Sequence, residues 1–253
     1  MPFTELIADV ESRRKKLSVF THRPEVDLGE HLGSRHVEVE FESLPGPEYG
    51  EFVVVSEDGE YVGSVDLAAL DRLVDPEIHD PGSRELVEAD FRYLLDILDD
   101  TVFSALDRRR LLAASREIED RALRVGTGTL VAGFQRLSVF ESQMEVYLNL
   151  ASATDLDVHV FGDADWEPPE LPGITVHASD DPDVTETWFV AFDGGGDPWY
   201  ECALVAREVG DGRYEGFWTY DPSLVDRVFE EAGFTKATRG RSADSTPDDA
   251  HDC

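Results

Sequence analysis

Residues 107–122, DRRRLLAASREIEDRA, form the densest polar segment of this chain that also carries an apolar stripe. Arg116 precedes Glu119 by three residues and Glu117 precedes Arg121 by four, so each pair can meet along a helix. On a solvated face such pairs exchange partners and stabilise a helix by about 0.3–0.5 kcal/mol each. The alternative interpretation is that Arg116 and Glu119 point into a cleft and bind a ligand.

The second interpretation makes a structural prediction. We expect Arg116 and Glu119 to be buried, each bonded to groups outside its own helix, because a buried charge is costly without a partner. Glu117 is expected on the opposite, exposed face of the same helix. Arg109 completes the candidate ligand-binding residues of this segment.

The segment Asp193-Gly194-Gly195-Gly196-Asp197 has the glycine content of a phosphate-binding loop. Phosphate loops lead into a helix N-terminus, where free N–H groups face the anion, whereas this segment lies between two strand patterns. We therefore interpret it as a hairpin turn. The spacing and final Glu of an EF-hand calcium loop are missing. The serines lack a Gly-x-Ser-x-Gly elbow, so no catalytic signature is found.

The histidines are scattered along the chain without metal-binding spacing. His36 and His159 fall near equivalent positions of an internal repeat, and a metal shared between them is the weaker alternative to two histidines on strand surfaces. The alternative function is an enzyme that metabolises a small molecule through the Arg116/Glu119 or the His36/His159 pair. Against it, neither pair shows a nucleophile–base spacing. No metal is predicted, and the cofactor is unknown.

The chain is strongly acidic, since 55 Asp and Glu against 22 Lys and Arg give a net charge of −33 over 253 residues. Such charge repels nucleic acid and destabilises a compact fold unless salt screens it. The acidic residues are spread along the chain and 41% of all residues are apolar, which favours a folded protein over a disordered one. We interpret the chain as a halophilic protein that does not bind nucleic acid directly.

Neither a secretory leader nor a membrane span is expected. The N-terminus lacks an apolar core, and no stretch reaches the roughly 18–20 apolar residues that a transmembrane helix needs. Cys202 and Cys253 make neither a disulfide framework nor a metal site. We therefore predict a cytoplasmic protein without membrane contact.

Hydrophobic periodicity predicts an α/β fold with mixed sheets. Strands are expected at about 17–20, 36–43, 51–56, 60–66, 129–134, 137–140, 156–162, 174–178, 187–192, 200–208 and 213–219. Helices are expected at about 4–16, 25–34, 66–74, 84–98, 107–124, 142–152 and 222–232. Asp107 is placed as an N-cap, and Gly126 stops the helix that Asp107 begins.

The chain carries a weak internal repeat. Leu17-Ser18-Val19-Phe20 recurs as Leu137-Ser138-Val139-Phe140, and similar strand patterns follow each copy in the same order. Chance is the alternative, because four residues of ordinary strand composition carry little information. The repeat predicts two strand–helix–strand–hairpin halves, about 3–75 and 129–232, joined by a central helical pair within 84–124, with a cleft at their junction. Residues 1–234 would form one domain, and 235–253 a disordered acidic tail.

Residues 101–140, TVFSALDRRR followed by LLAASREIEDRALRVGTGTLVAGFQRLSVF, resemble the DICT domain. TWFVAFDGGG (187–196) and GFWTYDPSLVD (216–226) resemble the rest of that domain in its stand-alone haloarchaeal form. The resemblance covers about residues 3–232. It implies a sensory module of diguanylate cyclase and two-component systems, often proposed for light responses, with no catalytic residues to transfer. The cyclase, phosphodiesterase or kinase modules often fused to such domains are missing here.

The resemblance favours a non-catalytic sensory or regulatory domain. Its cleft would bind a small ligand or a partner protein, such as a kinase or a transcription regulator. The candidate ligand-binding residues are Arg109, Arg116, Glu119, Trp188, Phe217 and Trp218. A pure oligomerisation scaffold, paired through exposed strand edges, is a third interpretation.

The charge predicts that the fold gains stability with salt. Between about 0.1 and 2 M KCl the Debye length falls from ~10 Å to ~3 Å or less, which screens the repulsion among −33 net charges. The melting temperature followed by circular dichroism should therefore rise steeply over this range. A melting temperature that stays flat would refute the interpretation as a halophilic protein.

Overall fold

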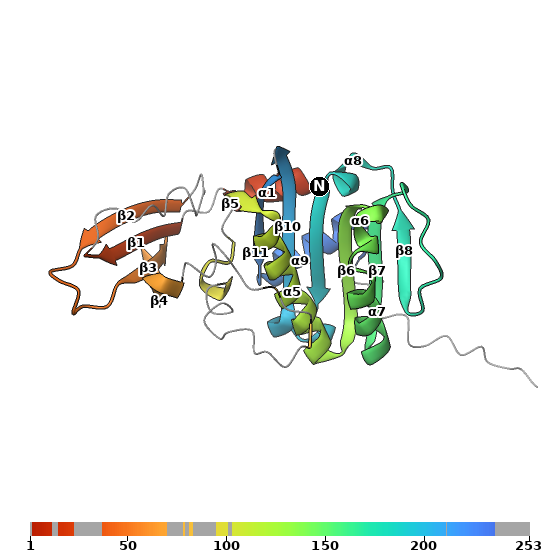
Figure 1. The fold of residues 1–253 in the computed structure, drawn as a ribbon, viewed down its shortest axis with the longest axis horizontal. Coiled ribbons are helices and arrows are strands. Elements are labelled where there is room, and N and C mark those ends of the chain that lie inside the picture. The colour runs from red at the N-terminus through yellow and green to blue at the C-terminus, as the bar shows by residue number, and fades with distance from the viewer. Residues whose placement is uncertain are drawn as a thin grey trace, which may run out of the picture.

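The computed structural model describes residues 2–11, 15–22, 37–69, 78, 81–82, 95–100, 103–210 and 212–235. The described residues form two sheets (Figure 1). The small sheet has the order β2-β1-β3-β4, with β1 (Lys15–Thr21), β2 (Val37–Ser43), β3 (Phe52–Glu57) and β4 (Glu60–Asp66). The large sheet has the order β5-β11-β10-β9-β6-β7-β8, with β5 (Phe103–Asp107), β6 (Thr127–Arg136), β7 (Asp155–Asp163), β8 (Ile174–Ala178), β9 (Thr187–Asp193), β10 (Glu201–Gly210) and β11 (Arg213–Thr219).

Helices cover both faces of the large sheet (Figure 1). One face carries α5 (Arg108–Val125), α6 (Leu137–Glu141) and α7 (Met144–Ala153), and the other α1 (Phe3–Glu11), α8 (Pro182–Thr185) and α9 (Pro222–Glu231). Strands β6, β7 and β8 run parallel, whereas β9, β10, β11 and β5 join through antiparallel pairs. The predicted α/β fold with mixed sheets is confirmed. None of the described helices is both long enough and apolar enough to cross a membrane.

Alternating side chains of the large sheet form two separate cores, as the two-residue period of a strand requires. Leu130 and Ala132 of β6 pack in the core beneath α5 and α7, while Val131 between them packs in the core beneath α1 and α9. In β9, Val190 packs in the core beneath α5 and α7, and Phe189 packs in the core beneath α1 and α9. Both faces of these strands are buried, which explains why their sequences are nearly continuous apolar runs.

The small sheet packs its inner face on residues 95–98 and shares a core with the α5 side of the large sheet. The Leu95 carbonyl accepts a hydrogen bond of 2.8 Å from Trp218 Nε1 of β11, which links this segment to the large sheet. Lys15 is almost fully buried and forms an ion pair of 2.8 Å with Asp99. The segment 95–100 therefore connects the two sheets.

Most predicted elements are present with small shifts of their ends. Helix α5 begins after Asp107, whose carboxylate accepts the Arg110 N–H at 2.9 Å, and ends at Gly126 in the left-handed conformation. Both caps agree with the prediction. Strand β5, helix α8 and the 3-10 turns η1 (Gly194–Gly196) and η2 (Pro198–Tyr200) were not predicted. The expected helix at 25–34, His36, most of 84–98 and the tail after residue 235 lie outside the described residues.

The second LSVF copy is helical, so the prediction of a strand at 137–140 is wrong. Leu137 and Phe140 are both buried at a spacing of three residues, which suits one face of a helix and not one face of a strand. The Asp165 carboxylate accepts the Ser138 backbone N–H at 2.9 Å and holds the first turn of α6. Val19 and Val139 therefore do not occupy equivalent strands.

The repeat nevertheless agrees with the strand order. In the small sheet β1 lies between its parallel partner β2 and its antiparallel partner β3, which pairs with β4. In the large sheet β6 lies between its parallel partner β7 and its antiparallel partner β9, which pairs with β10. The orders β2-β1-β3-β4 and β7-β6-β9-β10 thus correspond. The equivalent of β1 is β6, directly before the second LSVF copy.

The Asp193–Asp197 segment connects the antiparallel strands β9 and β10, so the hairpin prediction is confirmed. The Asp193 carboxylate accepts the backbone N–H groups of Gly195 at 3.0 Å and Thr129 at 2.9 Å. This carboxylate ties the connection to the start of β6. Its oxygens face backbone donors of the fold, which agrees with the rejection of a phosphate loop.

Gly133 of β6 allows the ring of Phe189 to lie across the neighbouring strand. The two residues are paired in register, and a Cβ on Gly133 would overlap the Phe189 ring, which is fully buried and stacked on Phe3. We expect Gly133→Ala to lower the free energy of unfolding by about 1–3 kcal/mol through overpacking. Denaturant unfolding measures the loss. Gly50→Ala is the matched control, because nothing lies within 4 Å of its new Cβ, and equal stabilities of the two variants would contradict the packing.

Candidate functional site

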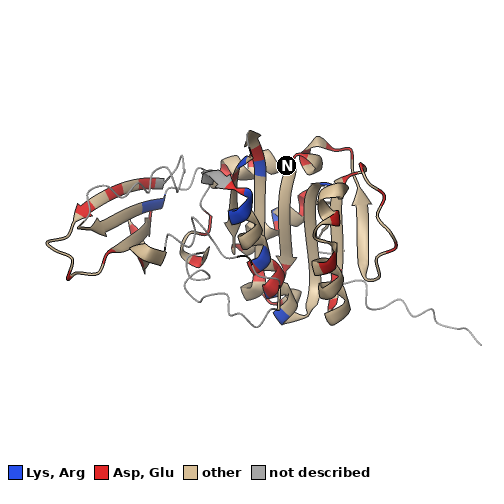
Figure 2. Cartoon of the chain, in the orientation of Figure 1, with Lys and Arg blue, Asp and Glu red and all other residues tan. Residues whose placement is uncertain are grey.

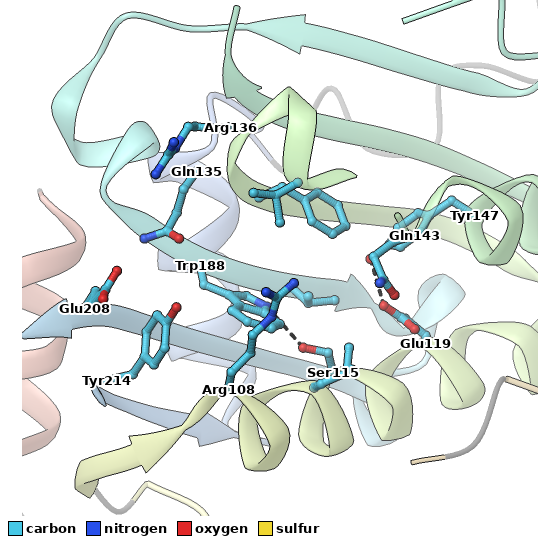
Figure 3. A pocket seen from close by; sticks show the side chains of 14 residues that line it. Arg108, Ser115, Glu119, Gln135, Arg136, Gln143, Tyr147, Trp188, Glu208 and Tyr214 are labelled. Atoms are coloured by element: carbon cyan, nitrogen blue, oxygen red, sulfur yellow. Dashed lines mark hydrogen bonds between the residues drawn. The ribbon is translucent and has the colours of Figure 1, made fainter. Parts of the chain in front are cut away.

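A cavity of about 180 Å³ opens between α5 and the α6–α7 pair on one face of the large sheet (Figure 3). Its α5 wall consists of Arg108, Leu112, Ser115 and Glu119. Their spacings of four, three and four residues place them on one side of a helix. The cavity therefore runs along almost three turns of α5.

The opposite wall and the floor come from elements far apart in the sequence. Val139 of α6, Gln143 at the N-cap of α7 and Tyr147 of α7 form the wall opposite α5. The floor is formed by side chains of the central strands, Phe134, Trp188 and Val190. The remaining lining residues are Gln135, Arg136, Glu208 and Tyr214. Of the charged side chains, Arg108, Arg136 and Glu208 are exposed at the opening and Glu119 is buried.

A buried network of charges joins α5 to α7 behind the cavity wall. Arg116 donates from Nη1 to Glu119 and from Nη2 to the side-chain oxygen of Gln143. Tyr147 donates its hydroxyl to the second oxygen of Glu119 at 2.8 Å. Arg116 is 7% exposed and Glu119 2%. The prediction that both residues are buried and bonded outside their own helix is confirmed.

The prediction for Glu117 is wrong. Its side chain is 1% exposed, with Arg124 Nη2 at 3.4 Å from Oε1, so it does not lie on a solvated face. The reason is that α5 is covered on more than one side, by the large sheet and by α7. Glu117 is therefore unsuitable as a silent control for substitutions of Arg116.

Trp188 lies in the middle of the cavity and is fixed by two contacts (Figure 3). Its Nε1–H donates to Ser115 Oγ at 3.2 Å, and its ring meets Tyr214 edge-on at 6.0 Å between centroids. Ser115 Oγ in turn donates to the Leu111 carbonyl at 2.9 Å. The Ser115 hydroxyl is thus occupied as a donor, and no histidine is among the described residues that line the cavity, so a serine nucleophile is not supported.

The rim next to α6 is shaped by an irregularity of β6. Gln135 has a positive φ of 62°, and the pairing of β6 with β7 shifts register between Gly133 and Arg136. Gln135 Nε2 donates to the Glu186 carbonyl at 3.2 Å. A left-handed backbone is strained for any residue except Gly, and such strain often marks functional sites. Here it turns Gln135 and Arg136 together towards the opening of the cavity (Figure 3).

Both tyrosines of the cavity stay protonated at neutral pH. Burial, followed by the charge of Glu119, raises the pKa of Tyr147 well above its usual value. Burial also raises the pKa of Tyr214, with a further increase from Glu208 and a smaller opposing effect of Arg108. Each phenol is therefore a hydrogen-bond donor and not an acid or base at the pH of a cell.

The structure brings together some of the candidate residues and separates others. Glu119 and Trp188 line the cavity, and Arg116 lies directly behind it. Arg109 is exposed, and the described cavity lining does not include it. Trp218 belongs to the core beneath α5, while Phe217 belongs to the core on the opposite face of the sheet. The cavity is lined by α5 and elements of the second half, so the expected position between the two halves is wrong for it.

The histidine pair does not form as expected. His36 lies outside the described residues, and His159 instead contacts His177 of β8, with 2.9 Å between Nδ1 and Nε2. Burial and the neighbouring His159 lower the pKa of His177, which favours its neutral form. Phe161 stacks on His177 at 4.5 Å, on the sheet face opposite the cavity. Within the described ranges, no group of three or more His, Cys, Asp and Glu residues is suited to hold a metal.

Sequence reasoning missed several residues of the cavity. Ser115, Gln143, Tyr147 and Tyr214 are not among the ligand-binding residues predicted from the sequence. The stripe of Arg108, Leu112, Ser115 and Glu119 on one face of a predicted helix was an available signal. The sequence carries no comparable signal for Gln143 and Tyr147, because these residues face α5 only as a result of tertiary packing.

Residues 93–209 match the family model of the DICT domain, described as a sensory domain in diguanylate cyclases and two-component systems. This match covers less than half of the 253 residues of the chain. The resemblance inferred from the sequence is thus confirmed for residues 93–209, which include all of α5–α7 and β6–β9. Of the cavity lining, Tyr214 alone lies outside the matched range.

The other comparisons add little to the match with the DICT family. No curated protein matches the chain. Among solved structures, a polyphosphate kinase from Porphyromonas gingivalis is similar at 12% sequence identity and a TM-score of 0.34. The alignment covers 90% of this chain but 47% of the kinase, so the chain spans less than half of that enzyme's length. A TM-score this low supports no statement about fold or activity.

The buried network predicts a large effect of Arg116→Ala on stability. Removing the guanidinium strands Glu119 in the interior, which costs about 3–5 kcal/mol of the free energy of unfolding. Arg207→Ala is the matched control, because Arg207 pairs with Glu186 at 3.0 Å on an exposed surface, where a pair is worth about 1 kcal/mol or less. Denaturant unfolding of both variants in the same high-salt buffer separates the two losses. Equal, small losses would show that Arg116 is not essential to the packing of α5.

Proposed function

We propose that this protein is a cytoplasmic sensor that binds a small molecule in the cavity between α5 and α6–α7. The observation that carries the proposal is the cavity itself, with an aromatic floor at Trp188 and a polar wall at Ser115 and Glu119. Concave sites with apolar walls and a few placed polar groups are typical of small-molecule binding. The volume of about 180 Å³ is close to that of a cavity that holds a single benzene ring.

The charge network offers a route from the ligand to the protein surface. Gln143 and Glu119 line the cavity and both accept hydrogen bonds from Arg116. A ligand that takes a hydrogen bond from or gives one to these side chains would change how α7 is held against α5. We propose that this change is read by a signalling partner, such as a kinase or a transcription regulator, and that residues 1–234 act as one unit.

No step of this proposal needs catalysis. The cavity offers a neutralised carboxylate at Glu119 and a serine hydroxyl that already donates to a backbone carbonyl. Sensing requires only that the ligand binds one arrangement of the network more tightly than another. The strong negative charge fits an environment of high salt, where the surface repulsion is screened.

Native mass spectrometry tests whether the cavity holds a ligand. The full chain, purified at high salt from cells that express it, should retain a small-molecule adduct. Leu112→Trp places an indole in the cavity from a half-buried position of α5 and should abolish the adduct. Val62→Trp on β4 is the matched control, because Val62 is 37% exposed and does not line the cavity. An adduct that persists in Leu112→Trp would place the ligand elsewhere and contradict the proposal.

A further inference from the structure

Most arginines among the described residues of this chain form an ion pair with a carboxylate. Acidic residues outnumber basic ones by 55 to 22, so an exposed guanidinium has many possible partners. Figure 2 shows acidic residues spread over the elements of both sheets and their connections, with fewer basic residues among them. Six arginines lie within 3.9 Å of a carboxylate, namely Arg110, Arg116, Arg121, Arg124, Arg207 and Arg227.

Of the arginines without an ion pair to a described carboxylate, Arg108 and Arg136 line the cavity, whereas Arg213 does not. Arg108 and Arg136 are both exposed and both line the cavity, from α5 and from the end of β6. No carboxylate of the described residues lies within the 4.0 Å ion-pair distance of either guanidinium. In a chain of net charge −33, two cations without ion pairs at the opening of one cavity form a local site for an anion.

Glu208, which lines the cavity, and Asp165, whose charge interacts with that of Arg136, are held by other groups. Glu208 accepts the Gly212 backbone N–H at 3.1 Å, which fixes it to the β10–β11 turn. Asp165 accepts the backbone N–H of Ser138 at 2.9 Å, and these Ser138 hydrogen bonds are the main reason that its pKa is lowered, with Arg136 a smaller cause. Neither carboxylate makes an ion pair with Arg108 or Arg136 in the described structure.

The inner part of the cavity combines apolar side chains with the uncharged polar groups of Ser115, Gln143 and Tyr147. Its carboxylate, Glu119, is neutralised by Arg116, and the apolar lining residues are Leu112, Phe134, Val139 and Val190. Trp188 presents its ring to the same space (Figure 3). A planar apolar group fits this interior, and its charged substituent would lie at the opening, where a guanidinium can bind a carboxylate or a phosphate through paired hydrogen bonds.

We infer that the ligand of this cavity is a small aromatic anion, a single ring with one carboxylate or phosphate group. The ring lies against Trp188, and the anionic group is held at the opening by Arg108 and Arg136. This inference rests on the proposed function of the cavity and adds the chemical class of the ligand to it.

Three probes of the same shape and different charge test the inference with the full chain. Benzoate, benzamide and benzamidinium each carry one group on a single ring, which is negative, neutral and positive, respectively. Ligand-observed NMR titrations at one fixed salt concentration give their dissociation constants. Benzoate should bind at least about tenfold more tightly than benzamide, the change expected for one charge-assisted hydrogen bond. Benzamidinium should bind most weakly. Phenyl phosphate in place of benzoate then separates a carboxylate from a phosphate site.

Two substitutions test whether Arg108 and Arg136 cause the tighter binding of benzoate than of benzamide. Arg108→Gln and Arg136→Gln should each weaken benzoate binding about tenfold and leave benzamide unchanged, because each removes a charge and keeps a polar side chain. Arg213→Gln is the matched control, since Arg213 is exposed on β11, does not line the cavity and has the same charge. It should leave both affinities unchanged. All three substitutions are at exposed positions, so the fold should be preserved.

The outcomes separate the class of ligand from the cavity's function. If benzamide binds as tightly as benzoate and Leu112→Trp abolishes both, the cavity is a ligand site and the anion inference is overturned. If benzoate binding survives Leu112→Trp, its site lies elsewhere and the inference is likewise overturned. Failure of all three probes to bind at millimolar concentrations also overturns it, and the native mass spectrum then tests the proposed function independently.

Discussion

The buried guanidinium of Arg116 is the constraint on which the site depends. A charged side chain that is 7% exposed must be neutralised and hydrogen-bonded. Glu119 of the same helix neutralises Arg116, and Glu119 and Gln143 beside α7 both accept its hydrogen bonds. Tyr147 completes the set by donating to Glu119 at 2.8 Å. Because these bonds have fixed lengths, they fix how far α7 stands from α5. The space that remains between the two helices above the sheet is the cavity, so its width follows from the network.

The acidic composition of the chain gives meaning to the two arginines at the cavity opening that form no ion pair with a described carboxylate. In a protein with balanced charges, an arginine without an ion pair at a surface carries little meaning. Here 55 acidic residues compete for 22 basic ones, and the two arginines at the cavity opening are nevertheless unpaired among the described residues. The cavity thus has two different ends, an inner part without net charge and an opening with two cationic side chains. That polarity restricts the ligands that fit.

The cavity lies beside one of two sets of strands that share the same order. The small sheet and the centre of the large sheet have matching orders, β2-β1-β3-β4 and β7-β6-β9-β10. Around the second set, β8, β11 and β5 extend the sheet and helices cover both faces. The cavity is built from these additions and from β6 and β9, so the similarity of the two halves does not place a site between them. The DICT match at 93–209 covers this second set and α5 and leaves out the small sheet.

Local sequence patterns determined most elements and their ends, because caps and periodicity act within a few residues. Asp107 and Gly126 define α5, and the apolar runs of β6 to β11 define the large sheet. The spacing of Arg116 and Glu119 predicted that they can pair along α5, but it left both a solvated and a buried pair open. The tertiary structure alone decided that the second LSVF segment is a helix, since Asp165 caps it and the core accepts Leu137 and Phe140 on one side. It also decided that Glu117 is buried and that Gln143, Tyr147 and Trp188 meet α5 in one cavity. These outcomes depend on contacts between residues far apart in the chain, which local composition does not contain.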